Sequence, residues 1–191
     1  LSTLNINLQL LEEDWQRSES ERELRSRRRI GILRQEVRRL EEIVDDFLRY
    51  ARRRELDRRP RDINAVIDEV LDLMGAALEQ ARVQVRRLYA EGIPPLALDR
   101  DQFKQAILNL VVNAQQAMPD GGELMVRTST LAGEVRVEIT DTGEGIPPQI
   151  LEKIWDVYFS SKRSGTGMGL PTARRIVEEH DGTIEVQTEA G

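Results

Sequence analysis

Amide side chains line one face of an otherwise apolar segment near the middle of this chain. Gln105, Asn109, Asn113 and Gln116 recur at spacings of four and three residues, so on a helix they form one continuous polar stripe. An amide without a partner in apolar surroundings costs about 1–3 kcal/mol, so we expect a polar group to face the stripe. Asn109 and Asn113 can satisfy each other or the backbone. Alternatively, an amide oxygen binds Mg²⁺, an ion that takes oxygen ligands and keeps waters and phosphate oxygens.

A carboxylate enters a glycine turn further along the chain. Asp141 ends an alternating apolar run and precedes Gly143 and Gly145. A carboxylate in this place can accept a hydrogen bond from the exocyclic amino group of a purine. The plainer interpretation is a simple turn, since Asp before Gly is common in turns.

A second glycine cluster, Gly165-Thr166-Gly167-Met168-Gly169, leads into a helical pattern at Pro171. Glycines let a backbone approach phosphates closely, and a helix N-terminus presents unpaired N–H groups and positive potential. Lys162 and Arg163 can add positive charge. A flexible loop is the plainer interpretation, because a glycine cluster alone is weak evidence. Long loops are uncommon in compact domains, so we predict that residues 141–170 form a hinged lid over a phosphate-bearing ligand.

Helical and strand patterns alternate over the part of the chain that contains these groups. The predicted helices cover 63–80, 101–117 and 171–179. The predicted strands lie at 83–85, 96–98, 123–130, 134–140 and 183–188. Asp99 can cap the second helix. Helices intermixed with hairpin strands predict an α+β fold, an α/β sandwich in which helices cover one face of a mixed sheet.

The first third of the chain has a heptad pattern instead. Apolar residues on this pattern are Leu1, Leu4, Leu8, Leu11 and Trp15, and then Ile30, Leu33, Val37, Leu40, Val44, Phe47 and Ala51. The pattern predicts an antiparallel helical hairpin that buries both of its stripes as a homodimeric four-helix bundle. A generic coiled-coil spacer is equally consistent with it. Arg58-Arg59-Pro60 should end the second helix, because the residue before a proline disfavours the helical region.

Charge and composition exclude several classes of protein. The 191 residues carry a net charge of −6. Residues 1–62 contain 16 Arg and 14 Asp or Glu, so their net charge is near +2. Residues 63–191 therefore have a net charge near −8, which does not suit binding to nucleic acid. The absence of cysteine excludes disulfides and thiolate metal sites. No apolar run approaches the ~20 residues of a membrane helix, so we expect a cytoplasmic protein, with any membrane anchor in segments outside this sequence.

The amide stripe and the two glycine clusters, taken in their order along the chain, resemble the motifs of the sensor histidine kinases. That family shares an ATP-binding fold with gyrase-type ATPases. Asn109–Ala114 resembles the asparagine box of that family, and Asp141–Ile146 its first glycine box. Trp155–Lys162 resembles its phenylalanine box, and Gly165–Leu170 its second glycine box. The resemblance implies a dimerisation and phosphotransfer hairpin at 1–57, a linker at 58–62 and a catalytic ATP-binding domain at 63–191.

The resemblance also implies roles for individual residues. Asn113 would bind Mg²⁺ with Asn109 beside it, and Asp141 would recognise the adenine amino group. The implied nucleotide-binding residues are Asn109, Asn113, Gln116, Asp141, Gly143, Gly145, Ile146, Lys162, Gly165, Thr166, Gly167, Met168, Gly169 and Leu170. The γ-phosphate of ATP would pass to a histidine and then to an aspartate of a response regulator receiver domain, with positioning and charge neutralisation as the main catalytic effects.

The chain departs from the family pattern in two ways. Trp155, Val157 and Tyr158 stand where Phe, Pro and Phe are usual, so we expect altered lid packing without loss of binding. No acceptor histidine is present, and both ends look cut, so we expect that histidine to lie shortly before Leu1. His180, the only histidine, ends a predicted helix, where a cation is favoured. The fragment should therefore bind Mg-ATP without phosphorylating itself.

Two alternatives remain open from the sequence. Gyrase-type ATP hydrolases carry a glutamate base four residues before the metal-binding asparagine, and this chain has Asn109 there, which cannot abstract a proton. A non-enzymatic dimer that only senses nucleotide is the third possibility.

Overall fold

The computed structural model describes residues 6, 8, 26, 28–37, 40, 41, 44, 56–160 and 166–189. The chain divides into two compact units, the first made of Leu1–Arg53 and Ser160–Met168, and the second of Arg54–Phe159 and Gly169–Gly191. No helix within these described ranges is both long and apolar enough to cross a membrane.

The first unit is helical at residues 28–37, and the side chains of Leu8, Ile30 and Val37 form a buried cluster. Leu33, on the same predicted stripe, is 53% exposed. The hairpin and the four-helix bundle stay predictions, because most of the residues that would form them lie outside the described part.

The second unit contains the predicted helices and strands. Its elements in chain order are β1 (Arg59–Arg61), α3 (Ile63–Gln80), β2 (Val83–Leu88), β3 (Leu96–Leu98), α4 (Arg100–Ala117), β4 (Gly122–Leu131), β5 (Glu134–Asp141), the 3₁₀ turns η1 (Pro148–Ile150) and η2 (Lys153–Trp155), and α5 (Gly169–Glu179). The predicted bounds of α3 and β3 agree with those observed. Asp99 caps α4 as predicted, because its Oδ1 accepts from the backbone N–H groups of Asp101 and Gln102, both at 3.1 Å.

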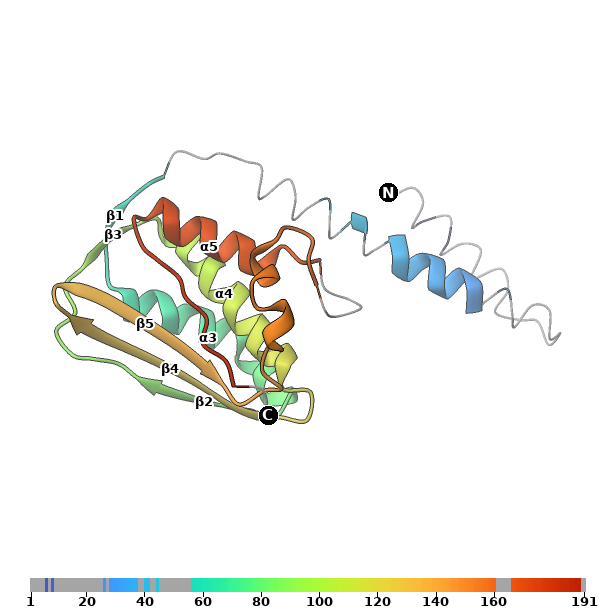
Figure 1. Ribbon diagram of the computed structural model, residues 1–191, viewed down its shortest axis with the longest axis horizontal. Helices are drawn as coiled ribbons and strands as arrows, with labels where there is room; N and C mark the ends of the chain where they lie inside the picture. The colour runs from blue at the N-terminus through green and yellow to red at the C-terminus, as the bar shows by residue number, and fades with distance from the viewer. Residues whose placement is uncertain are drawn as a thin grey trace. The chain divides into compact units, whose positions relative to one another are not determined.

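The main sheet has the strand order β2-β4-β5. β2 runs parallel to β4 with Val83 opposite Gly122, and β4 runs antiparallel to β5 with Leu124 opposite Asp141. The β4–β5 hairpin closes through Ala132 and Gly133, whose positive φ angles of 52° and 86° suit a two-residue hairpin turn. Helices lie on one side of this mixed sheet (Figure 1), which confirms the predicted α+β class.

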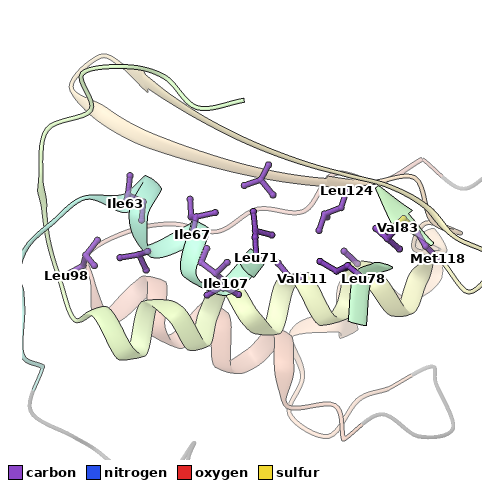
Figure 2. Close-up of a cluster of buried hydrophobic side chains, with 14 residues drawn as sticks. Ile63, Ile67, Leu71, Leu78, Val83, Leu98, Ile107, Val111, Met118 and Leu124 are labelled. Carbon is purple, nitrogen blue, oxygen red and sulfur yellow. The ribbon is translucent and has the colours of Figure 1, made fainter. Parts of the chain in front are cut away.

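The hydrophobic core fills the space between this sheet and two helices. Ile63, Ile67 and Leu71 of α3 lie among Ile107 and Val111 of α4, under the sheet (Figure 2). On its other side α4 packs against α5, where the small side chains of Ala106 and Ala173 let the two helices approach. Apolar contacts on two sides of α4 explain why residues 106–114 are apolar except for Asn109 and Asn113.

Two predicted segments differ from the structure. Residues 183–188 are not a strand, although their exposure still alternates, because no described strand supplies a hydrogen-bonded ladder to them. The predicted linker at 58–62 contains β1, which pairs with β3 so that Pro60 lies opposite Ala97. Proline is tolerated there because β1 is an edge strand with one described neighbour.

His180 bridges α5 and α4 through both of its ring nitrogens. Its Nε2 accepts a hydrogen bond from the backbone N–H of Asp99 at 2.9 Å, so this nitrogen carries no proton. Its Nδ1 lies 2.7 Å from the carbonyl oxygen of Ile176 and therefore donates to it. The ring also meets Phe103 edge-on, with the ring centroids 5.7 Å apart. His180 thus joins the end of α5 to the start of α4.

Candidate functional site

Asn109 links the amide stripe of α4 to the first residue of α5. Its Oδ1 accepts a hydrogen bond from Gln105 Nε2 at 3.0 Å, one helical turn earlier. Its Nδ2 donates to the carbonyl oxygen of Gly169 at 3.1 Å. The plainer interpretation of the stripe therefore holds for Asn109, whose two amide atoms are both engaged with protein groups.

Asn113 is different, because its Nδ2 is buried and has no hydrogen-bond partner in the described part of the chain. A Cβ atom placed on Gly169 would lie 3.5 Å from this Nδ2, so the amide faces the beginning of α5. An unpaired buried amide costs about 1–3 kcal/mol, which a ligand would relieve. Gln116, the last amide of the stripe, is exposed.

The first glycine turn packs on the C-terminal end of α4. A Cβ atom on Gly143 would lie 2.6 Å from the carbonyl oxygen and 2.7 Å from the Cβ of Ala117, so only glycine fits there without displacement. The neighbouring Glu144 N–H donates to the same Ala117 carbonyl at 3.1 Å. This bond satisfies one of the carbonyl groups that a helix end leaves unpaired.

The carboxylate of Asp141 is oriented by this turn. Its Oδ1 accepts from the backbone N–H of Gly143 at 2.8 Å. Its Oδ2 has no hydrogen-bond partner among the described residues, and the side chain is half-buried. One carboxylate oxygen is thus held by the protein while the other remains able to accept a hydrogen bond from a ligand.

The C-terminal segment supports the other side of the turn. Gly145 has a φ of +69°, and a Cβ atom there would lie 2.5 Å from the carbonyl oxygen of Glu189. The N–H of Ile146 donates to Thr188 Oγ1 at 2.8 Å. Sequence reasoning missed Thr188, because nothing local indicates a contact with a residue 42 positions earlier.

The second glycine cluster is described only in part, since Lys162 and Gly165 lie outside the described residues. Thr166, Gly167 and Met168 belong to the first unit, where Gly167 has a φ of +69° and Met168 is buried. Gly169 and Leu170 are the first residues of α5, which begins two residues before the predicted position. Pro171 is therefore still in the first turn, where proline is tolerated.

α4 thus brings together two chemically different ends of one site. Asn109 and Ala117 are eight residues apart, about 12 Å along the helix axis. The Ala117 end holds the Asp141 carboxylate, which suits a ring with an amino group. The Asn109 end holds the Asn113 amide and the N-terminus of α5, which suits an anion.

Mg²⁺ fits the Asn113 end of this site. No cluster of three or more His, Cys, Asp or Glu side chains that could hold a metal occurs in the described ranges. Mg²⁺ does not need such a cluster, because it is commonly held by few protein oxygens and completed by waters and phosphates. Turning the unpaired Asn113 amide about its last bond presents an oxygen where Nδ2 now lies.

Comparisons with known proteins agree with this geometry. Residues 98–191 match the family described as histidine kinase-, DNA gyrase B-, and HSP90-like ATPase. Sensor histidine kinase ZraS of Escherichia coli (strain K12) is 32% identical over 160 residues, which cover 84% of this chain and 34% of ZraS. This chain therefore spans about a third of the length of that curated relative.

Solved structures with a similar fold include two that were determined as complexes. Histidine kinase ThkA, in complex with response regulator protein TrrA, is 25% identical, with a TM-score of 0.69 over 95% of this chain and 53% of that chain. Full-length ShkA, in complex with AMPPNP, has a TM-score of 0.67 over 93% of this chain and 38% of that chain. Its sequence identity is 23%, so it supports the fold alone.

Proposed function

Because this chain carries the catalytic ATP-binding domain of a histidine kinase, within the histidine kinase-, DNA gyrase B-, and HSP90-like ATPase family, we propose that it binds Mg-ATP and transfers the γ-phosphoryl group to a histidine. An aspartate of a response regulator then takes the phosphoryl group from that histidine. The observation that carries the proposal is the buried Nδ2 of Asn113, which has no hydrogen-bond partner among the described residues and faces the first residue of α5.

Adenine recognition is assigned to the Asp141 end of the site. Oδ2 of Asp141 accepts a hydrogen bond from the exocyclic amino group, while the Gly143 N–H fixes the carboxylate through Oδ1. A carbonyl-bearing purine such as guanine presents an acceptor at that position and leaves the carboxylate unpaired. Gly145 and Ile146 support this end through Glu189 and Thr188.

Triphosphate binding is assigned to the other end. The N-terminus of α5 provides N–H groups and positive potential, and Asn109 holds that N-terminus in place through the Gly169 carbonyl. Asn113 would hold Mg²⁺, which when bound neutralises phosphate charge and orients the γ-phosphoryl group. The family motif assigns Lys162 and the loop from Gly165 to phosphate binding as well.

The arrangement supports a kinase over a hydrolase. At the position where gyrase-type hydrolases carry a glutamate base, Asn109 uses both of its amide atoms in bonds to Gln105 and Gly169. An amide so held neither abstracts a proton from water nor moves easily toward one. Rapid ATP hydrolysis therefore has no base at this position.

His180 is not the phosphoryl acceptor. Both of its ring nitrogens are engaged, by the Asp99 N–H and the Ile176 carbonyl, so neither is free to attack phosphorus. The acceptor is instead a histidine that this sequence does not contain, in a dimeric helical hairpin of the kind that we assign to residues 1–57. Domain bounds at 58–62 and 63–191, the homodimer, the response regulator partner and a cytoplasmic location belong to the same proposal.

Phosphoryl transfer to a separate acceptor tests the proposal. The chain is incubated with Mg²⁺, γ-labelled ATP and, as a second polypeptide, the dimeric acceptor hairpin of a related sensor histidine kinase. We expect acid-labile label on the acceptor histidine, slow release of inorganic phosphate, and no label on this chain. Fast phosphate release without a labelled acceptor would favour the hydrolase, and label on His180 would refute the acceptor assignment.

A further inference from the structure

A tryptophan in the segment that resembles the phenylalanine box contacts an arginine of α5, and neither residue is among those assigned to nucleotide binding. Trp155 ends η2 and is half-buried, and the Arg174 guanidinium lies over its ring with Cζ 5.4 Å from the ring centroid. Arg174 lies on α5, and its Nε also donates to Glu178 Oε1 at 2.8 Å. Glu178 thus holds one edge of the guanidinium while its face meets the indole, which is the geometry of a cation–π contact.

The two partners belong to segments that carry opposite ends of the site. Trp155 follows the glycine turn through the 3₁₀ turn η1 (Pro148–Ile150) and a two-residue link to η2, so residues 142–154 connect it to Asp141. Arg174 lies five residues after Gly169, about 7.5 Å along α5 from the phosphate-binding end. The neighbouring Ile154 is buried, which anchors η2 independently of the charge.

We propose that the Trp155–Arg174 pair is a positioning contact that couples the base-binding turn to the phosphate-binding end of α5. The proposal rests on the proposed function and names two residues that are not among the nucleotide-binding residues assigned there. Without the pair, α5 keeps its contacts with α4, and the turn keeps its contact with Ala117. The two ends are then free to shift relative to each other, and a ligand that spans both must fix this relative position on binding.

The chain after η2 indicates that the end of this turn is held in a defined conformation. Asp156 N–H donates to the Lys153 carbonyl at 3.0 Å, and Phe159 N–H donates to the Asp156 carbonyl at 3.1 Å. Tyr158 adopts a φ of +70°, an unfavourable region for a bulky side chain, so surrounding contacts must maintain it. A fixed geometry at this point is what a coupling contact requires.

Nucleotide affinity in a double-mutant cycle tests the coupling. Trp155→Ala and Arg174→Ala should each weaken the binding of Mg-AMPPNP about 2- to 5-fold, the range of an exposed cation–π contact, and the double variant should bind no worse than either single one. Trp155→Phe and Arg174→Lys keep a ring and a cation and should restore most of the affinity. Arg136→Ala removes an equal charge from the exposed face of β5 and should leave the affinity unchanged.

Fluorescence separates failure of this inference from failure of the proposed function. With Trp15→Phe as background, Trp155 is the only fluorophore of its kind, and Arg174→Ala should make it more accessible to acrylamide. Mg-AMPPNP should protect Trp155 in the background protein but not after Arg174→Ala. A wild-type chain that binds no Mg-AMPPNP refutes the proposed function, whereas unchanged quenching after Arg174→Ala refutes the contact. The coupling is refuted if the affinity loss of the double variant equals the product of the two single losses. It is also refuted if the single alanine variants bind Mg-AMPPNP as tightly as the wild type.

Discussion

Gly143 is the residue whose replacement most directly tests how the site is assembled. A Cβ atom at this position would lie 2.6 Å from the Ala117 carbonyl oxygen, 2.7 Å from the Ala117 Cβ and 2.7 Å from Asp141 Oδ1. Two of these atoms belong to the rigid end of α4, so the turn itself must move. Gly143→Ala should therefore displace the hydrogen bond from Glu144 to Ala117 and change the orientation of Asp141.

These close contacts determine how much folding free energy Gly143→Ala loses. Overpacking of this kind costs about 1–3 kcal/mol of folding free energy. Gly75→Ala is the matched control, because Gly75 lies within the exposed part of α3 and a Cβ atom there meets nothing within 4 Å. That substitution should raise the free energy of unfolding by about 0.5–1 kcal/mol, since alanine loses less conformational entropy in a helix than glycine.

Urea unfolding followed by far-ultraviolet circular dichroism measures both effects by linear extrapolation. The same chemical change should shift the stability in opposite directions at the two positions. Gly143→Ala should also weaken Mg-AMPPNP binding, whereas Gly75→Ala should not. If Gly143→Ala leaves both stability and affinity at their wild-type values, the turn is not held against α4 as described here.

Three further predictions concern positions around the site. His180→Ala should lower the free energy of unfolding by about 1–3 kcal/mol, because the Asp99 N–H loses its acceptor; an unchanged melting temperature would contradict this. Asn109→Ala should weaken Mg-AMPPNP binding in calorimetry while leaving the chain folded, since it releases the first residue of α5; equal affinity would contradict that role. Burial, followed by its hydrogen bond to Asp68, raises the pKa of Tyr89 above its usual 10.0. The folded chain then keeps this proton at a pH where the unfolded chain loses it, so this contribution is complete below pH 10 and is lost as the pH rises further. Tyr89→Phe should reduce the fall in stability between pH 10 and 11 in urea titrations, and an identical fall would contradict the assignment.

Local sequence patterns were sufficient to predict most helices and strands of the second unit. The helix at Ile63–Gln80 follows from apolar residues at helical spacing over five turns, and the β4–β5 hairpin from two alternating runs around Gly133. Asp99 as a cap of α4 also follows from local chemistry, because a short acidic side chain reaches the N–H groups two and three residues on. Such features need only residues that are close in sequence.

Contacts between residues that are distant in the sequence could not be predicted from local patterns. The bond from Asp99 to His180 joins residues 81 positions apart, so a helix-end argument alone did not reveal this contact. Residues 183–188 keep a strand-like alternation without a partner, since alternation does not specify pairing. The amide stripe could be predicted from the sequence. Which of its amides bonds to the protein and which faces a ligand depends on where Gly169 contacts α4.

The central claim is that Asp141 and Asn113 define the two ends of an adenine nucleotide site, and the affinity of Asp141→Asn for Mg-AMPPNP tests it most directly. Calorimetric titration compares the wild-type chain, this variant and Asp101→Asn, which changes an exposed carboxylate at the opposite end of α4. We predict that Asp141→Asn binds at least about tenfold more weakly, because the amide offers one acceptor where Gly143 and the adenine amino group need two. Asp101→Asn should bind like the wild type. Equal affinity of Asp141→Asn and the wild-type chain would contradict the account.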